Sequence, residues 1–298
     1  MILVTGATGT VGREVVRRLP ADGPVRVLTR RPGRVGDVPG HVEVAAGDYG
    51  DAPSLERALS GVTKVFLLTG AVGGDDDERF LRAVRGTDVR LIVKLSAAAV
   101  ANSAADDAIT RWQRRCEARL RECGTEWTLL RPRAFMSNTL GWAPLIASGR
   151  PVSALYGTSL NSCVDPRDIA DVAVRALTEE GHGGRAYTLT GPEPVSAVDQ
   201  AACLSRLLGK PVRFEEMDAA RARAAYLRRH PEHVAEALLQ SAEQQRAGAK
   251  ARVEPTVEEV TGRPARSYAQ WAADHIGFFA DGAVPRRPGE AGAGRRPE

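Results

Sequence analysis

A glycine-rich loop near the amino terminus has the spacing of a phosphate-binding site. Gly6, Gly9 and Gly12 directly follow the apolar run 1–5, and a helical pattern starts at Val11. Between a strand and a helix, such glycines permit a tight turn, close approach of the backbone to a pyrophosphate, and close helix–strand packing. The helix amino terminus adds free N–H groups and a partial positive charge. We therefore expect the loop to bind a dinucleotide through Gly6, Thr8, Gly9, Thr10, Val11 and Gly12.

The end of the second apolar run indicates which dinucleotide is bound. An acidic residue at this position usually holds the ribose 2′-hydroxyl of NAD(H). This chain has Thr29, Arg30 and Arg31 there instead. Guanidinium groups bind phosphate through paired, charge-assisted hydrogen bonds. We therefore predict NADP(H) as the cofactor, with these three residues around its 2′-phosphate. The alternative is that both arginines are ordinary exposed loop residues.

The elements that must position these residues follow from the hydrophobic pattern. Short apolar runs alternate with helical patterns, which is typical of a parallel sheet covered on both faces. Right-handed crossovers then give a doubly wound α/β fold of the Rossmann type. Strands are expected at residues 1–5, 25–29, 42–45, 62–68, 89–95 and 127–131. Helices are expected at residues 11–19, 53–59, 78–84 and 106–122.

The second half is less regular, and we expect it to add a smaller, mainly helical substrate lobe. Helices are expected at 166–179, 196–208 and 267–279, with a strand at 186–190. Residues 218–251 are rich in Ala, Arg, Glu and Gln and break near Pro231. They are either a lid over the substrate site or a helical appendage on the surface.

These elements are expected to form one domain over residues 1–280. Residues 1–135 would mainly bind the cofactor, and residues 136–280 would contribute the substrate lobe. The tail 281–298 is rich in Pro, Gly and Arg and is expected to be disordered.

The composition narrows the classes of partner. No run approaches the ~18 apolar residues of a membrane span, and no signal sequence is recognisable, so we expect a cytoplasmic protein. The four cysteines form no Cys-x-x-Cys pair, which argues against zinc, iron–sulfur or redox-disulfide chemistry and favours free thiols. The arginines are interspersed with acids and form no basic stripe with aromatic residues, so we expect no nucleic-acid partner. The expected partner is a small-molecule substrate, and the expected state is a monomer or a homodimer.

Further motifs follow in a family-specific order. They are Gly47, Asp48 and Tyr49; Leu67, Leu68, Thr69 and Gly70; Ser96; Glu117, Leu120 and Gly124; 128–132; Phe135, Met136 and Asn138; Val164, Asp165, Asp168, Ile169 and Ala170; and Tyr187, Leu189, Thr190 and Gly191. Together with the glycine loop, they make the chain resemble the NmrA-like group of atypical short-chain dehydrogenase/reductases over about residues 1–280. The resemblance implies that Asp48 and Tyr49 lie near the adenine and that Thr69 and Gly70 also contact the cofactor.

The acid–base pair of the broader superfamily is missing. In related enzymes a tyrosine protonates the substrate carbonyl, and a lysine four residues later lowers its pKa. Counting back from Glu117 places Ile109 at the tyrosine position and Gln113 at the lysine position. Neither side chain is an acid–base group.

Two functions remain open. The first is an NADPH-dependent reductase acting on a small carbonyl compound, such as an aromatic ketone or a quinone that stabilises its own oxyanion. Its catalytic candidate is Ser96, which would polarise the carbonyl, and its substrate candidates are Phe135, Asn138, Tyr156 and Tyr226. The second is a redox sensor that binds NADP(H) without turnover. Asp165 and Asp168 are expected to begin and cap a helix.

Overall fold

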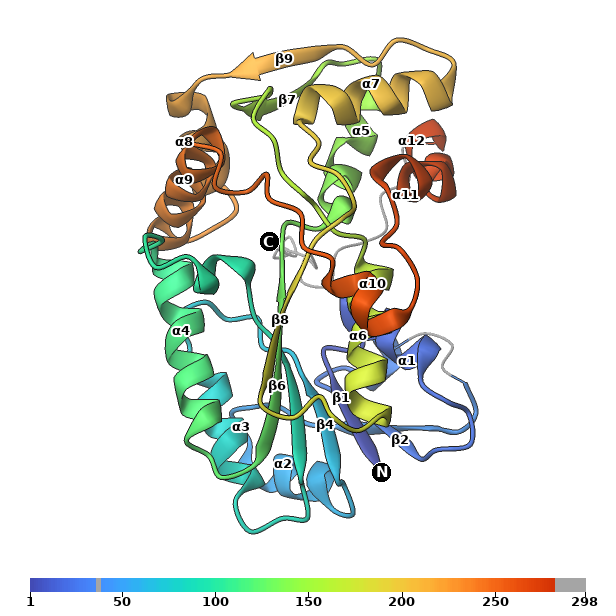
Figure 1. Ribbon diagram of the computed structural model, residues 1–298, viewed down its shortest axis with the longest axis vertical. Helices are drawn as coiled ribbons and strands as arrows, with labels where there is room; N and C mark the ends of the chain where they lie inside the picture. Colours follow the sequence, from blue (N-terminus) through green and yellow to red (C-terminus); the bar gives the residue numbers. More distant parts are fainter. Residues whose placement is uncertain (36–38, 282–298) are drawn as a thin grey trace, which may run out of the picture.

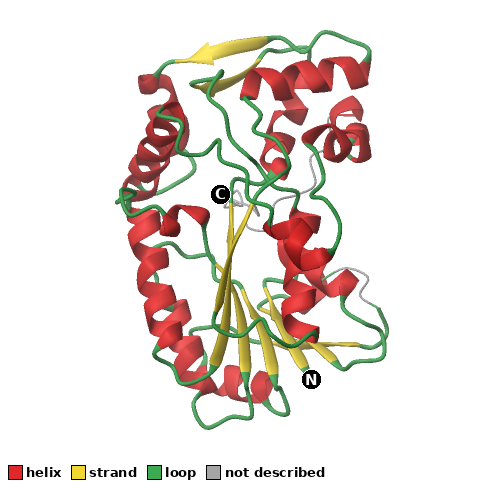
Figure 2. Cartoon of the chain, viewed as in Figure 1, coloured by secondary structure: helices red, strands yellow, loops and turns green. Residues whose placement is uncertain are grey.

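The computed structural model describes residues 1–35 and 39–281. Its larger part is built around a sheet of seven parallel strands in the order β3-β2-β1-β4-β5-β6-β8. Figure 2 shows this sheet with helices on either side. These strands are β1 (Ile2–Thr5), β2 (Val25–Thr29), β3 (Val42–Ala46), β4 (Lys64–Leu67), β5 (Leu91–Leu95), β6 (Glu126–Pro132) and β8 (Arg185–Leu189). The register places Val4 of β1 beside Val27 of β2 and Phe66 of β4. The predicted doubly wound parallel sheet is confirmed.

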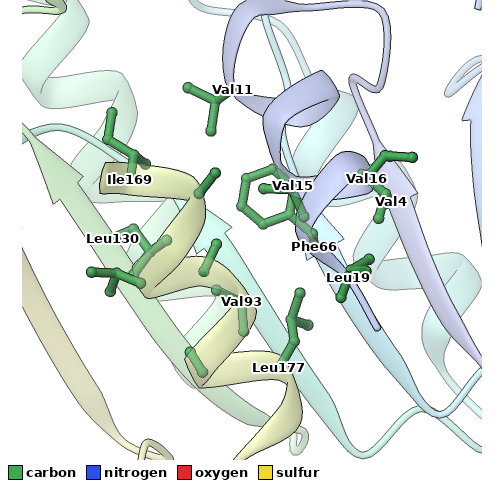
Figure 3. Close-up of a cluster of buried hydrophobic side chains, with 14 of the residues drawn as sticks. Val4, Val11, Val15, Val16, Leu19, Phe66, Val93, Leu130, Ile169 and Leu177 are labelled. Carbon is green, nitrogen blue, oxygen red and sulfur yellow. The ribbon is translucent and has the colours of Figure 1, made fainter. Parts of the chain in front are cut away.

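Helices cover both faces of the sheet, because successive side chains of each strand point to opposite faces. One face, which includes Val4, packs against α1 (Thr10–Arg18), α6 (Pro166–Thr178) and α10 (Thr256–Thr261). Figure 3 shows this core, in which Val15 and Phe66 lie between the two longer helices. The other face, which includes Leu3, packs against α2 (Ala52–Leu59), α3 (Asp76–Val84) and α4 (Ala108–Arg121).

A second lobe lies beyond the end of the sheet where β6 and β8 lead into it (Figure 1). Trp271, Phe279 and Leu204 are fully buried in its own hydrophobic core. Its helices are α5 (Ala143–Ala147), α7 (Ala197–Leu208), α8 (Ala219–Leu227), α9 (Glu232–Arg246), α11 (Tyr268–Asp274) and α12 (Ile276–Asp281), together with the 3₁₀ helix η3 (Met136–Trp142), which packs on α5 and α12. The 3₁₀ helices η1 (Pro32–Arg34) and η2 (Ala98–Ala101) follow β2 and β5. Its two strands, β7 (Val152–Leu155) and β9 (Phe214–Met217), pair in parallel.

The second lobe differs from the prediction in its last helix and in a strand pair that was not predicted. The single closing helix predicted at 267–279 is wrong, because the chain leaves helical geometry at His275 and two helices, α11 and α12, form instead. The β7–β9 pair was not predicted, because each strand is four residues long and only partly buried. The break near Pro231 is confirmed, since this residue caps α9, and the tail 282–298 lies outside the described residues.

The predicted roles of Asp165 and Asp168 at a helix start and the predicted free thiols are confirmed. Asp165 is the N-cap of α6 and accepts a hydrogen bond from the Arg167 N–H at 2.8 Å. Asp168 lies in the first turn of that helix and binds Arg266. All four cysteines are free thiols. In the described part of the chain, no helix is long and apolar enough to cross a membrane.

Candidate cofactor and substrate site

The glycine loop leaves the amino terminus of α1 open. Gly6 has a φ of +65°, and its carbonyl accepts the Gly9 N–H at 2.8 Å. A Cβ on Gly12 would lie 2.2 Å from the Gly6 oxygen, so this glycine is required for packing the helix on the loop. Gly9 is the N-cap of α1 and makes no side-chain capping bond, and the first turn holds no acidic residue. The free N–H groups and the helix dipole therefore favour an anion here.

Gly9 differs from Gly12 in what surrounds it. A Cβ on Gly9 would meet only the Gly6 oxygen, at 3.1 Å. The protein itself could therefore accommodate a small side chain with a slight shift, whereas a pyrophosphate on the loop would lose its space. This position is the part of the loop that fits cofactor binding.

The residues predicted to hold the 2′-phosphate lie at the carboxyl end of β2. Arg30 and Arg31 are exposed, and the Thr29 hydroxyl accepts the Arg31 N–H at 3.1 Å. The Arg30 Nε lies 3.8 Å from Oδ2 of Asp48, and both side chains are largely exposed. Such an exposed ion pair holds its partners weakly, so Arg30 remains available for an additional anion.

Tyr49 is held in place by contacts with the protein core. Its hydroxyl donates to the Leu68 carbonyl at 2.9 Å, and its ring packs edge-on against Phe80 at 6.1 Å. Burial raises the pKa of Tyr49. An adenine contact predicted for this segment would therefore come from the exposed Asp48 and the loop backbone.

The loop after β4 is anchored by a buried ion pair. Thr69 donates its hydroxyl proton to Asp77 Oδ2 at 2.6 Å, and Lys94 of β5 pairs with the same carboxylate. Lys94 and Asp77 are almost completely buried, whereas Gly70 is exposed. This arrangement fixes the loop on which Thr69 and Gly70 were predicted to contact the cofactor. The sequence signal for it is a lysine within the apolar run of β5.

A second buried network surrounds Ser96, which directly follows β5. The Ser96 hydroxyl donates to Glu117 Oε1 at 2.6 Å. Arg131 of β6 donates to both oxygens of Glu117, at 2.9 and 2.5 Å, and Arg121 donates to Oε2 at 3.0 Å. Burial alone would raise the pKa of Glu117, but the hydrogen bonds from Arg131 and Ser96 outweigh it and lower the pKa. Glu117 is therefore a buried carboxylate that holds Ser96 and two arginines.

This network changes what Ser96 can offer a substrate. Its proton is engaged by Glu117, so its oxygen presents lone pairs rather than a donor. Polarising a carbonyl would require this bond to break. The catalytic role of Ser96 remains a prediction.

The two positions at which the acid–base pair of the superfamily is replaced lie on α4, the helix that also carries Glu117. Ile109 is half-buried near the start of α4, and Gln113 is buried one turn later. Within the described residues, Oε1 of Gln113 is buried and has no hydrogen-bond partner. An unpartnered buried amide is costly unless a ligand satisfies it.

The four predicted substrate residues are not brought together by the described hydrogen bonds. Tyr156 has a φ of +54° and donates its hydroxyl to Glu243 of α9. Tyr226 is half-buried on α8, and Phe135 is half-buried against the core beneath α6. Asn138 is exposed on η3. Their contacts with a substrate remain predictions.

Two cations near the ends of β6 and α9 were not predicted from the sequence as site residues. Arg133 directly follows β6, and Lys250 follows α9. They are 117 positions apart in the sequence, so no local spacing connects them. Both are partly buried in the fold.

The fold and the glycine loop define a nucleotide-binding protein of the Rossmann type. A family model described as NAD(P)H-binding matches residues 6–180, and the chain belongs to this family. The predicted NmrA-like relationship, NADP(H) as cofactor and the oxidoreductase class are confirmed.

Three similar proteins cover nearly the whole chain. A (4-alkanoyl-5-oxo-2,5-dihydrofuran-3-yl)methyl phosphate reductase of Streptomyces griseus is 56% identical over 94% of this chain and 99% of its own. An NAD(P)H azoreductase of Xenophilus azovorans is 37% identical over 94% and 99%. The crystal structure of the NADPH-dependent quinone oxidoreductase QOR2 from Escherichia coli, complexed with NADPH, superimposes with a TM-score of 0.79 at 25% identity, over 93% and 99%.

Proposed function

We propose that the protein transfers a hydride from NADPH to a conjugated carbonyl acceptor that stabilises its own negative charge. The observation that carries this proposal is the absence of an acid at the usual place. Ile109 and Gln113 occupy the tyrosine and lysine positions, and the hydroxyl of Ser96 donates its hydrogen bond to Glu117. A substrate that needed protonation during hydride transfer would react slowly here.

The residues present fit the cofactor. The open face of Gly9 and the free N–H groups of α1 suit the pyrophosphate, and the exposed Arg30 and Arg31 suit the 2′-phosphate. The unpartnered Oε1 of Gln113 can accept a hydrogen bond from a bound hydroxyl. Bound NADPH supplies the hydride, and the protein supplies position and electrostatics.

The favoured acceptor class is a 4-acyl butenolide bearing a methyl phosphate, as in the name of the Streptomyces griseus relative. Its ring double bond is conjugated with both the lactone carbonyl and the acyl carbonyl. Hydride addition at ring carbon 3 forms a C–H bond and moves the π electron pair to carbon 4, where both carbonyl oxygens share the charge. A proton from water then completes the saturated lactone. A general acid typically contributes about 10²–10⁴-fold, which such an acceptor can forgo.

Quinones are a second acceptor class with the same property. Hydride addition to a quinone gives a phenolate, whose charge is delocalised over an aromatic ring. The similarity to the Escherichia coli quinone oxidoreductase supports this class. An isolated ketone is disfavoured, because its alkoxide has no comparable stabilisation. The sensor alternative is disfavoured because the similar proteins are reductases.

The test is an acceptor series with purified protein and NADPH, followed by the absorbance of the reduced nicotinamide. We expect turnover with the acyl butenolide methyl phosphate, slower turnover with a benzoquinone, and none with an aliphatic ketone. The Gly9→Val variant serves as the control for uncatalysed reduction. Comparable turnover of the aliphatic ketone would overturn the proposal, and tight NADPH binding without turnover of any acceptor would favour the sensor.

A further inference from the structure

Arg133 follows the carboxyl end of β6 and has no anionic partner among residues 1–35 and 39–281. Its backbone N–H donates to the Leu189 carbonyl at 2.9 Å, which continues the β6–β8 pairing by one residue. Its side chain is half-buried, and its Nε is buried without a hydrogen-bond partner among the described residues. In the same part of the chain, no carboxylate lies within ion-pair distance of its guanidinium. A buried guanidinium without an acceptor is costly in the free protein.

Lys250 is held next to the same loop. Ser162 donates its N–H to the Lys250 carbonyl at 2.9 Å, and its hydroxyl donates to the Arg252 carbonyl at 2.8 Å. Two residues later, Val164 pairs with the chain that follows Arg133. The segment with Lys250 is therefore fixed against the end of β6.

The ammonium group of Lys250 likewise has no carboxylate partner in the described part of the chain. Its Nζ donates to the uncharged Ser241 hydroxyl at 2.6 Å. Burial, and secondly the positive charge of Arg133, lower its pKa to about 8, whereas Asp107 acts in the opposite direction. The contacts of Ser162 and Val164 place the segments of Arg133 and Lys250 side by side, and two positive charges at short range repel each other.

The nearby acids are already engaged. Asp107 caps α4 by accepting the N–H and hydroxyl of Thr110, at 2.9 and 2.6 Å. Glu254, which acts on Arg133, pairs with the exposed Arg252 at 2.9 Å. Neither carboxylate neutralises Arg133 or Lys250 by direct contact within the described residues.

The location of this pair points toward the substrate rather than the cofactor phosphates. Lys250 is bonded to Ser241 of α9, and α9 packs against α4. Lys250 therefore lies beside the helix whose first turn holds Ile109, the position of the superfamily acid. The glycine loop follows β1, which is three strands away from β6 in the sheet. At the usual strand spacing this is about 14 Å. A pyrophosphate bound on the glycine loop would therefore not reach Arg133.

We propose that Arg133 and Lys250 form a subsite for the phosphate monoester of the substrate. A guanidinium can bind two phosphate oxygens in parallel, and an ammonium adds a point charge. A dianion between them would satisfy the buried Arg133 Nε and relieve the repulsion between the two cations. This inference rests on the proposed function, and it assigns the phosphate of the acyl butenolide class to named residues.

The test compares two substrates that differ only in the phosphate: the acyl butenolide methyl phosphate and its hydroxymethyl form. In wild-type protein we expect kcat/KM to be at least roughly 100-fold higher for the phosphorylated compound. Arg133→Met and Lys250→Met should each lower it about 10- to 100-fold for that compound, mainly through KM, because each removes one charge-assisted contact. Both variants should leave the hydroxymethyl compound within about twofold. Arg133→Lys should restore part of the loss, and Lys210→Met, an exposed lysine far along the same lobe, should change neither value.

A binding measurement separates failure of the subsite from failure of the proposed function. With NADP⁺ present no hydride is available, so calorimetry reports binding of the two compounds alone. We expect the phosphorylated compound to bind more tightly to wild type and to lose this advantage in both variants. Equal binding of the two compounds to wild type would overturn the subsite while leaving the reductase intact. Equal losses for both compounds in the variants would also overturn it, since that is the result of a proton donor or of a structural role.

Discussion

The cofactor side and the substrate side of the sheet edge are built in opposite ways. Around β1 and β2, the predicted phosphate-binding groups are backbone N–H groups and the exposed side chains Arg30 and Arg31. Around β5, α4 and β6, the polar groups are buried and bonded to one another, with Glu117 holding Ser96 and Arg131. The first region presents open donors to a ligand. In the second region, the donors are hydrogen-bonded to other groups of the protein.

This difference explains how a reductase can work without a tyrosine acid. The cofactor side keeps the groups predicted to bind the cofactor. On the substrate side, Glu117 stays ionised and accepts the hydrogen bond of the Ser96 hydroxyl. Hydride acceptance then depends on the electronic structure of the substrate. In the proposed phosphate subsite, Arg133 and Lys250 would then provide the selectivity.

The largest effect is expected from changing the open loop. Gly9→Val should abolish NADPH binding while the protein remains folded, because the new side chain points into the space of the pyrophosphate. Gly12→Ala is the matched contrast: its Cβ would lie 2.2 Å from the Gly6 oxygen, so it should destabilise the fold itself. Cofactor titration by fluorescence and circular dichroism of both variants check this. Normal NADPH binding by a folded Gly9→Val protein would show that the loop is only a turn.

The next effect concerns the buried network. Glu117→Gln removes the charge that Arg131 and Arg121 both contact, so we expect a loss of about 3–5 kcal/mol in the free energy of unfolding. The control is Glu78→Gln, a surface carboxylate paired with Arg82, whose loss should cost less than about 1 kcal/mol. Urea denaturation measures both. Equal stabilities of the two variants would mean that the network contributes little to the fold.

A smaller effect is expected for cofactor preference. Wild type should bind NADPH more tightly than NADH by roughly 10- to 100-fold, which corresponds to one lost charge-assisted phosphate contact. Arg30→Ala combined with Arg31→Ala should remove this preference and leave NADH binding unchanged. Parallel calorimetric titrations of the two cofactors measure it. If the native protein binds both equally, these arginines have no role at the 2′-phosphate.

The smallest effect is expected from Ser96→Ala. Loss of a true oxyanion donor typically costs about 10²–10³-fold in kcat. Because the Ser96 hydroxyl already donates its hydrogen bond to Glu117, we expect a loss of less than about tenfold on the acyl butenolide. Steady-state kinetics at saturating NADPH provide the value. A loss of 100-fold or more would assign carbonyl polarisation to Ser96 and contradict the engaged-proton geometry.

The sequence was sufficient for features that depend on local spacing. The glycine loop, the arginines after β2 and the alternation of strands with helices all lie in short segments, and the structure places them as expected. Asp165 was recognised as a helix cap for the same reason. In contrast, Arg133 and Lys250 lie far apart in the sequence, and only the contacts of Ser162 and Val164 bring their segments together. The engagement of the Ser96 proton likewise depends on Glu117, which is 21 positions away, and on its burial.

The most direct test of the central claim is the destination of the hydride. The protein would reduce an acyl butenolide methyl phosphate with NADPH that carries deuterium at the transferable position, and NMR of the product would locate the label. We predict deuterium at ring carbon 3 and an intact acyl ketone, because the electron pair must be accepted by the conjugated carbonyls. Deuterium on the former acyl carbonyl carbon, with a new hydroxyl there, would contradict the account, since that reaction needs the acid that position 109 lacks.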